Sequence, residues 1–115
     1  SFTWIFDITD ETNPIPISSW QASDLTPIGD PDQPFTGCHQ PSEIVTGTVI
    51  PFAWFAKGIR MLDISNPHAP KEVAHFEPDP QPGCDRICAN DITTDDRGLI
   101  YVIDRLRGLH IVEQT

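Results

Sequence analysis

The chain has 115 residues and a mass of 12.8 kDa, which is the size of a single domain, and 38% of its residues are hydrophobic. It holds 12 Pro and 7 Gly, and the longest stretch free of both, residues 84–97, has 14 residues, which excludes long helices, coiled coils and membrane-spanning helices. Because 7 Lys and Arg face 17 Asp and Glu, the net charge of −10 would repel nucleic acid and anionic membrane surfaces. We expect this acidity to serve a solvated surface or to bind cations.

Short apolar segments recur along the chain. Residues 4–10 (Trp-Ile-Phe-Asp-Ile-Thr-Asp) are followed by paired prolines and then by Trp20. Residues 60–66 (Arg-Met-Leu-Asp-Ile-Ser-Asn) repeat this pattern 56 positions later, and paired prolines and Phe76 follow them. A third copy begins at residues 108–113, which match residues 58–63 at an offset of 50. Such self-similarity is typical of repeat architectures.

The stretches between these segments also correspond. The dipeptide Gly-Cys at 37–38 precedes residues 42–45 and 52–55, and Gly-Cys at 83–84 precedes residues 90–93 and 99–103. We therefore expect units of about 50 residues with four short strands each, the first of them after the Gly-Cys. Residues 94–98 (Thr-Asp-Asp-Arg-Gly) predict a hairpin turn, and Asn66 with Pro67 predicts another.

The apolar pattern within the units is two-sided. Residues 99–103 are apolar at every position, and in residues 59–64 only Arg60 and Asp63 interrupt the run. Four-stranded units of about 50 residues that are covered on both faces are the blades of a β-propeller. The predicted class is therefore all-β, as a partial β-propeller of antiparallel blades. A β-sandwich is the alternative, although it does not predict the repeated Asp with its paired prolines.

Residues 58–70 (Gly-Ile-Arg-Met-Leu-Asp-Ile-Ser-Asn-Pro-His-Ala-Pro) resemble the LVIVD repeat, a propeller-forming motif of bacterial and archaeal proteins. Residues 98–113 are similar to the strand pair that leads into that repeat. The first copy departs from the pattern, because it lacks the leading Gly and has three extra residues between Asp10 and Pro14. The resemblance implies a propeller fold and an exported, periplasmic or extracellular, location, but it implies no particular activity.

The strand count predicts a little over two blades. We expect residues 1–36 to hold the outer strands of one blade and a linker, residues 37–82 a full blade, and residues 83–115 an incomplete one. Propellers close with four or more blades, so we expect a C-terminal fragment or small subunit that another chain or further copies of itself complete. Ser1 leaves open a processed N-terminus or the start of a fragment.

Polar residues of neighbouring repeats are expected to meet near the propeller axis. If the strand after each Gly-Cys is innermost, the pairs Ser42-Glu43 and Asn90-Asp91 are equivalent. The expected site then contains His39, Glu43, Arg86, Asn90 and Asp91. His39 and Glu43 are candidate ligands of a divalent metal, and the same site could hold a small polar ligand with a base and an electrostatic clamp. Alternatively, these residues only cap strands and satisfy loop amides.

Two functions follow from these expectations. The first is a non-enzymatic binding and interaction scaffold built on a partial propeller. The second is a subunit or fragment of a hydrolytic or metal-dependent propeller enzyme with its polar site at the axial mouth.

Two further features concern structure. Asp7, Asp63 and Glu113 recur at strand ends, which predicts carboxylates that accept turn amides. The three cysteines, Cys38, Cys84 and Cys88, predict burial or one local disulfide, because the three-residue spacer of the last two differs from that of a zinc knuckle.

Overall fold

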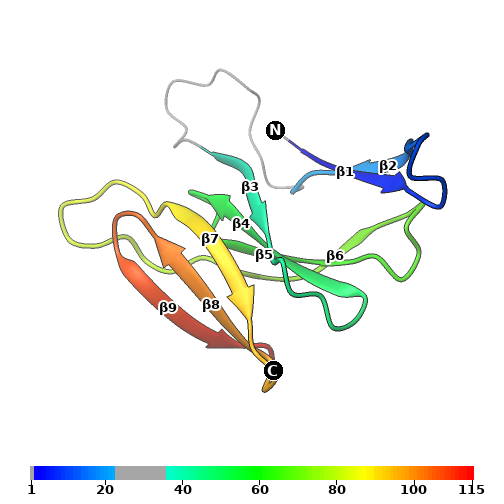
Figure 1. Ribbon diagram of the computed structural model, residues 1–115. Coiled ribbons are helices and arrows are strands. Elements are labelled where there is room, and N and C mark those ends of the chain that lie inside the picture. The colour runs from blue at the N-terminus through cyan, green and yellow to red at the C-terminus, as the bar shows by residue number, and fades with distance from the viewer. Residues whose placement is uncertain (1, 23–35) are drawn as a thin grey trace.

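The computed structural model describes residues 2–22 and 36–115, which form nine β-strands and no helix (Figure 1). The strands are β1 (Thr3–Asp7), β2 (Ile15–Trp20), β3 (Thr36–Pro41), β4 (Val49–Phe55), β5 (Ile59–Asp63), β6 (Lys71–Phe76), β7 (Ala89–Thr94), β8 (Leu99–Asp104) and β9 (Gly108–Glu113). The part of the chain described here contains no helix long and apolar enough to cross a membrane. Ser1 and most of the predicted linker lie outside the described residues.

The strands form three groups, which we call blades. β1 and β2 pair as a hairpin, the first blade. β3 to β6 pair in chain order as the second blade, and β7 to β9 form the third. All pairs are antiparallel, and a single residue pair, Phe55 with Ala89, joins the second and third blades into one curled seven-stranded sheet. The predicted all-β, partial propeller of a little over two antiparallel blades is confirmed.

The strand register repeats with the sequence. Thr3 pairs with Trp20 in the first blade, and Ile59 pairs with Phe76 at the same place in the second. All the remaining pairs of β1 with β2 also recur between β5 and β6 at the offset of 56, and so does the bulge. The pairing of β4 with β5 recurs in β8–β9 at an offset of 50. The repeats detected in the sequence are therefore structural repeats.

Two of the recurring carboxylates hold turns. The Asp7 Oδ1 atom accepts a hydrogen bond from the amide of Thr9 at 2.9 Å, and the Asp63 Oδ1 atom accepts one from the amide of Ser65 at 2.8 Å. The hydrogen bond from the Ser65 amide is the main cause that lowers the pKa of Asp63. The predicted structural role of these two residues is confirmed.

The core lies in two layers, one on each face of the second blade. Phe52 and Trp54 of β4 pack toward the first blade, where the Trp20 ring meets the Trp54 ring edge-on with centroids 5.0 Å apart. Ala53, between them in sequence, points to the opposite face and packs in a second cluster. That cluster joins the second and third blades and contains Ala53, Ile59, Met61, Ala89, Ile92, Ile100 and Val102. This arrangement explains the two-sided apolar pattern.

The first strand of the second blade lies earlier than predicted. β3 contains Gly37 and Cys38 instead of following them, and Ser42 and Glu43 come after its end. In the third blade, Gly-Cys at 83–84 stands in the loop before β7. The two dipeptides are not equivalent because the inner strands take their register from β4 and β8, whose apolar alternation sets the pairing.

The three cysteines are free thiols, and all three are half-buried. Burial raises the pKa of the Cys38 thiol, which receives a hydrogen bond from the Thr3 hydroxyl at 3.4 Å. The predicted burial is therefore partial, and no local disulfide forms among them.

Candidate functional site

The inner strands of two neighbouring blades meet at His39. β3 and β7 run in the same direction, since each pairs antiparallel with β4. The Nδ1 atom of His39 on β3 lies 2.5 Å from the carbonyl oxygen of Asn90 on β7. The His39 ring also packs against the ring of Phe55, with centroids 4.7 Å apart. Two of the predicted site residues are thus brought together at the junction of the blades.

This contact orients the His39 ring. A carbonyl oxygen only accepts hydrogen bonds, so the Nδ1 atom of His39 carries the proton. In the neutral ring the Nε2 atom then keeps its lone pair for a proton or a metal ion. The His39 side chain is exposed and therefore accessible to solvent and ligands.

Asn90 and Asp91 differ in their surroundings. The Oδ1 atom of Asn90 is buried and has no hydrogen-bond partner among the described residues. The Asp91 side chain is exposed, and its Oδ1 atom accepts a hydrogen bond from the next amide, that of Ile92, at 2.8 Å. Asp91 therefore acts partly as a local backbone partner, whereas Asn90 keeps an unused acceptor.

Glu43 stands on a turn that is held from two sides. The amide of Ser42 donates to the carbonyl of Pro51 at 2.8 Å, and the Ser42 hydroxyl donates to the carbonyl of Ile44 at 2.9 Å. The Thr94 hydroxyl of β7 donates to the same carbonyl at 3.3 Å. The turn is therefore fixed against β4 and β7, while the Glu43 side chain is exposed.

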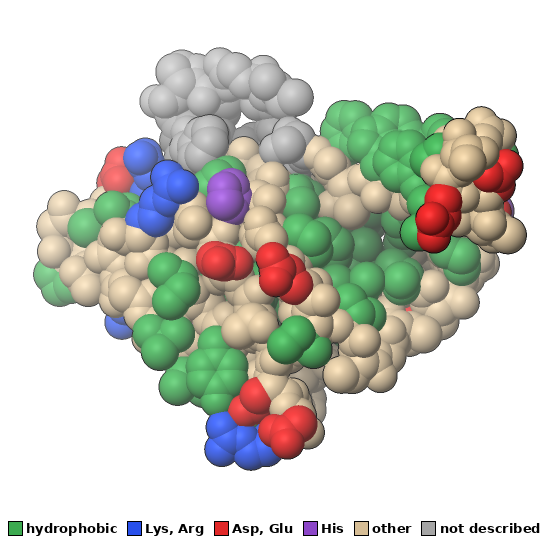
Figure 2. Space-filling view, viewed as in Figure 1, with side chains coloured by type: hydrophobic (Ala, Val, Ile, Leu, Met, Phe, Trp, Pro, Cys, Tyr) green, Lys and Arg blue, Asp and Glu red, His purple; other side chains and the backbone are tan. Residues whose placement is uncertain are grey.

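Arg86 completes the predicted set from the segment before β7. It is half-buried, and its Nη1 atom lies 3.9 Å from the Asp85 carboxylate. Figure 2 shows histidine, acidic and basic side chains gathered over the inner strands. In residues 2–22 and 36–115 no group of three or more His, Cys, Asp or Glu is placed to hold a metal ion, so a metal on His39 and Glu43 stays a prediction.

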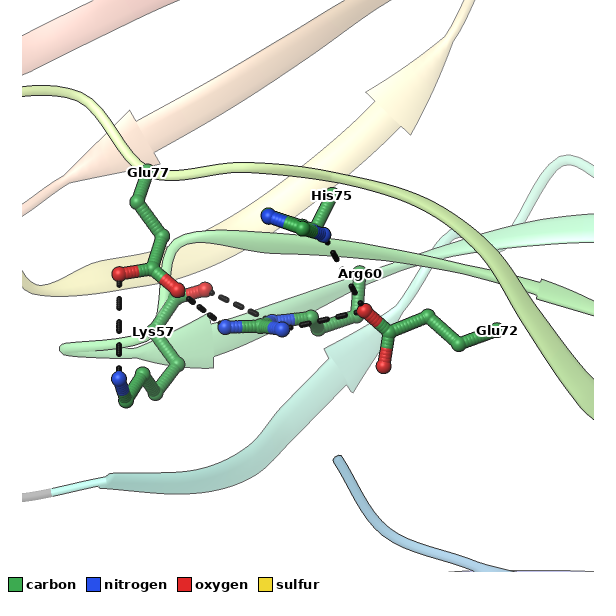
Figure 3. A network of polar contacts seen from close by, with 5 residues as sticks. All are labelled: Lys57, Arg60, Glu72, His75 and Glu77. Atoms are coloured by element: carbon green, nitrogen blue, oxygen red, sulfur yellow. Dashed lines mark hydrogen bonds and ion pairs between the residues drawn. The ribbon is translucent and has the colours of Figure 1, made fainter. Parts of the chain in front are cut away.

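A buried arginine network was not predicted. The Arg60 side chain, only 2% exposed, donates from Nη1 to Glu72 at 3.1 Å and from Nε to the Lys57 carbonyl at 3.1 Å, and its Nη2 atom contacts Glu77 (Figure 3). The Nζ atom of Lys57 lies 3.9 Å from Glu77. The sequence does carry a signal for this network. It has a single Arg within an apolar strand, and Glu residues within and just after the next strand.

The outer face of the third blade is apolar and exposed. Ile100, Val102 and Val112 pack toward the second blade, so the residues that alternate with them point the other way. These are Ile103 (48% exposed), Leu109 (55%) and Ile111 (55%), which we call the C-terminal face. Their counterparts 50 positions earlier, covered by the third blade, are Ala53 (0%), Ile59 (2%) and Met61 (7%).

The first blade has a matching exposed face. Phe6 is 48% exposed, whereas Leu62, its counterpart 56 positions later, is 0% exposed because the first blade covers it. Trp4 is exposed on the same side, with its ring centroid 6.2 Å from that of Phe6, and we call these two residues the N-terminal face. The two end faces thus repeat positions that are buried where a neighbouring blade is present.

Comparison with known proteins returned nothing: no family model, no curated protein and no solved structure matches the chain. The resemblance to the LVIVD repeat remains a prediction that rests on residues 58–70 and 98–113. The function is therefore inferred from the geometry of the chain itself.

Proposed function

We propose that this chain is part of an LVIVD-like β-propeller that acts as a binding and interaction scaffold, and that another chain or further copies cover its end faces. One observation carries the proposal. Ile59 and Met61 are buried beneath the next blade, whereas Leu109 and Ile111 occupy the same repeat positions and are more than half exposed. A contiguous apolar face of this kind typically marks an interaction surface.

The free energy gained by covering the C-terminal face indicates how much contact a partner must make. Complete burial of a Leu or Ile side chain contributes about 1.5–3 kcal/mol. The side chains of the C-terminal face are about half exposed, so covering each contributes about 1 kcal/mol. Three such residues do not offset the cost of association, about 4–15 kcal/mol. A partner therefore has to contact more of the blade than these side chains.

The solution mass of the chain tests the proposal. We expect native mass spectrometry to detect an assembly heavier than 12.8 kDa. Leu109→Asp should shift the assembly toward the monomer, because it places a charge on the C-terminal face. Val73→Asp is the matched control, since Val73 is 48% exposed but belongs to the blade that is covered on both faces. A folded, monodisperse 12.8 kDa species for the unaltered chain would contradict coverage of the end faces by further copies.

A further inference from the structure

A groove lies between the first and second blades, at the end of the strands away from the contact of Trp20 with Trp54. It has a volume of about 590 Å³, which is within the usual range for small-molecule sites, about 300–1,000 Å³. Figure 2 shows the molecule hollowed beside the first blade, with hydrophobic side chains around the hollow. The groove is therefore large enough to hold a small organic molecule.

The walls of the groove are apolar. Ile5 of β1 and Ile17 of β2 line it from the first blade, and Ile64 and Pro67 line it from the turn after β5. These four residues are half-buried, so each presents part of its side chain to the groove. The Ser18 hydroxyl of β2 donates to the Pro67 carbonyl at 2.6 Å, which ties the two sides of the groove together.

The junction of the second and third blades shows that this space is not required by the repeat. Met61, the counterpart of Ile5 56 positions later, is 7% exposed and packs in the cluster that joins those two blades. The first blade also has a neighbour on this side, yet none of the described residues of β1 belongs to the cluster that joins the first and second blades. Ile5 thus occupies a position that the repeat buries, and the groove leaves it partly uncovered.

The groove carries one negative charge. Among the described residues that line it, with His counted as neutral, Asp7 is the only one with a formal charge at pH 7. Hydrogen bonds from the hydroxyl and the amide of Thr9 lower the pKa of Asp7, and a charge interaction with His68 adds to this effect. Asp7 is therefore ionised at neutral pH. Apolar walls beside a single carboxylate are complementary to a cation with an apolar body.

We infer that the groove between the first and second blades binds a small organic amine, with its apolar body against Ile5, Ile17 and Ile64 and its ammonium group beside Asp7. Burial of the apolar body supplies most of the affinity, and Asp7 selects the charge. Both blades that form the site belong to this chain, so the inference goes beyond the proposed scaffold and does not depend on what covers the end faces.

The test is an NMR titration of the full chain with hexylammonium chloride. A ligand with seven non-hydrogen atoms is expected to bind with a Kd of about 1–10 mM, and to shift the amide signals of Ile5, Ile17 and Ile64. An exposed ion pair changes an affinity by a factor of about 1.5–5, so hexan-1-ol should bind about threefold more weakly and hexanoate more weakly still. Equal affinity for the three compounds, or no saturable shift at the groove up to about 50 mM, would overturn the inference.

A lysine side chain of another protein carries the same chemical groups as a small amine. The probe that separates the two is Nα-acetyl-lysine amide, whose backbone groups a groove of this size has to accommodate beside the ammonium chain. We expect it to bind more weakly than hexylammonium. Binding at least as tight as that of hexylammonium would make a lysine side chain the occupant and overturn the inference.

The repeat supplies a matched control for the charge. Asp7→Asn keeps an oxygen for the Thr9 amide and removes the charge, so the affinity for hexylammonium should fall about threefold while that for hexan-1-ol stays unchanged. Asp63→Asn changes the equivalent residue of the second blade, which does not line the groove, and should alter neither affinity. An equal loss of hexylammonium affinity in both variants would show an effect of net charge and overturn the inference.

A second pair of variants tests the wall of the groove. Ile17→Trp should fill the groove and abolish binding of hexylammonium and hexan-1-ol alike. Val73→Trp is its control, because Val73 is the counterpart of Ile17, is 48% exposed and lies outside the groove. Unchanged binding in a folded Ile17→Trp would place the amine elsewhere and overturn the inference. If Ile17→Trp does not fold, the comparison of Asp7→Asn with Asp63→Asn decides.

Discussion

Arg60 shows how one residue can depart from its repeat and still fit the fold. Trp4 and His110 occupy the corresponding positions of the first and third blades. The Arg60 guanidinium is buried, but two carboxylates and a backbone carbonyl accept its hydrogen bonds. A buried charge is tolerated only with such partners, so Arg60 depends on residues that the repeat pattern does not specify.

Arg60→Met keeps the volume of the side chain and removes its charge. Breaking a buried ion pair typically costs 3–5 kcal/mol, and Glu72 and Glu77 are 20% and 35% exposed, so that water can partly rehydrate them. We therefore expect the free energy of unfolding to fall by about 3 kcal/mol, measured by urea denaturation. Arg105→Ala, an exposed control, should change it by less than about 0.5 kcal/mol. An unchanged midpoint for Arg60→Met would show that the network adds no stability.

Asp95 organises the turn between β7 and β8. Its Oδ1 atom accepts the Arg97 and Leu99 amides, each at 3.0 Å, and its Oδ2 atom accepts the Arg97 Nε at 2.8 Å and the Tyr101 hydroxyl at 2.9 Å. Desolvation acts to raise the pKa of Asp95, but the hydrogen bonds from Arg97, Leu99 and Tyr101 outweigh it and lower the pKa to about 2. The hairpin turn predicted at residues 94–98 is confirmed.

The depressed pKa of Asp95 predicts a pH dependence of stability. Because the unfolded value is about 3.9, Asp95 stabilises the fold fully above about pH 4, and this contribution is lost as the pH falls through about 2. Asp95→Asn should lower the urea midpoint at pH 6 and flatten its fall below pH 4. Asp96→Asn controls for the change of net charge. An NMR titration of the Asp95 carboxyl with a midpoint near 4 would refute the assignment.

At the scale of the strands, most of the fold could be predicted because the repeats carry their own register. The Asp residues and paired prolines mark the third and fourth strands of the first two blades, and the pairing of these strands recurs without exception. The inner strands could not be aligned from their Gly-Cys dipeptides. Their position depends on long-range pairing with β4 and β8, which a short local dipeptide does not encode.

The candidate site was predictable only in part for the same reason. Gln40 of β3 pairs with Ala53, and Asp91 of β7 pairs with Ile103. Because Ile103 is the counterpart of Ala53 in the third blade, Asp91 corresponds to Gln40. The sequence had aligned Asp91 with Glu43 instead. His39 and Asn90 come together nonetheless, since they stand one residue before this pair in adjacent inner strands.

Gly58 and Gly108 provide a prediction at the scale of the blade. Both have positive φ, 64° and 90°, so alanine at either position carries a backbone penalty of about 1–2 kcal/mol. Only Gly58 faces a fourth strand, where the added methyl group would overlap Phe76. Thermal unfolding should show Gly58→Ala to be clearly less stable than Gly108→Ala. Equal stability of the two variants would contradict the pairing of β6 against Gly58.

The whole molecule has one blade covered on both faces and two blades covered on one. In a propeller each blade buries its neighbours' faces, and the fold closes when the last blade meets the first. The second blade shows the covered state within the chain, and the end faces show the uncovered one. The strand count predicted a little over two blades within residues 1–115, but the identity of the exposed residues required the observed register.

We propose that the end faces are blade-to-blade contact surfaces. Radical footprinting of the assembled protein in solution, read by mass spectrometry, tests it most directly. We expect Leu109 and Ile111 to be labelled as weakly as Ile59 and Met61, which are buried in the covered blade, and far less than the exposed Val73. Labelling of Leu109 and Ile111 at the level of Val73, in a chain that is folded, would contradict it.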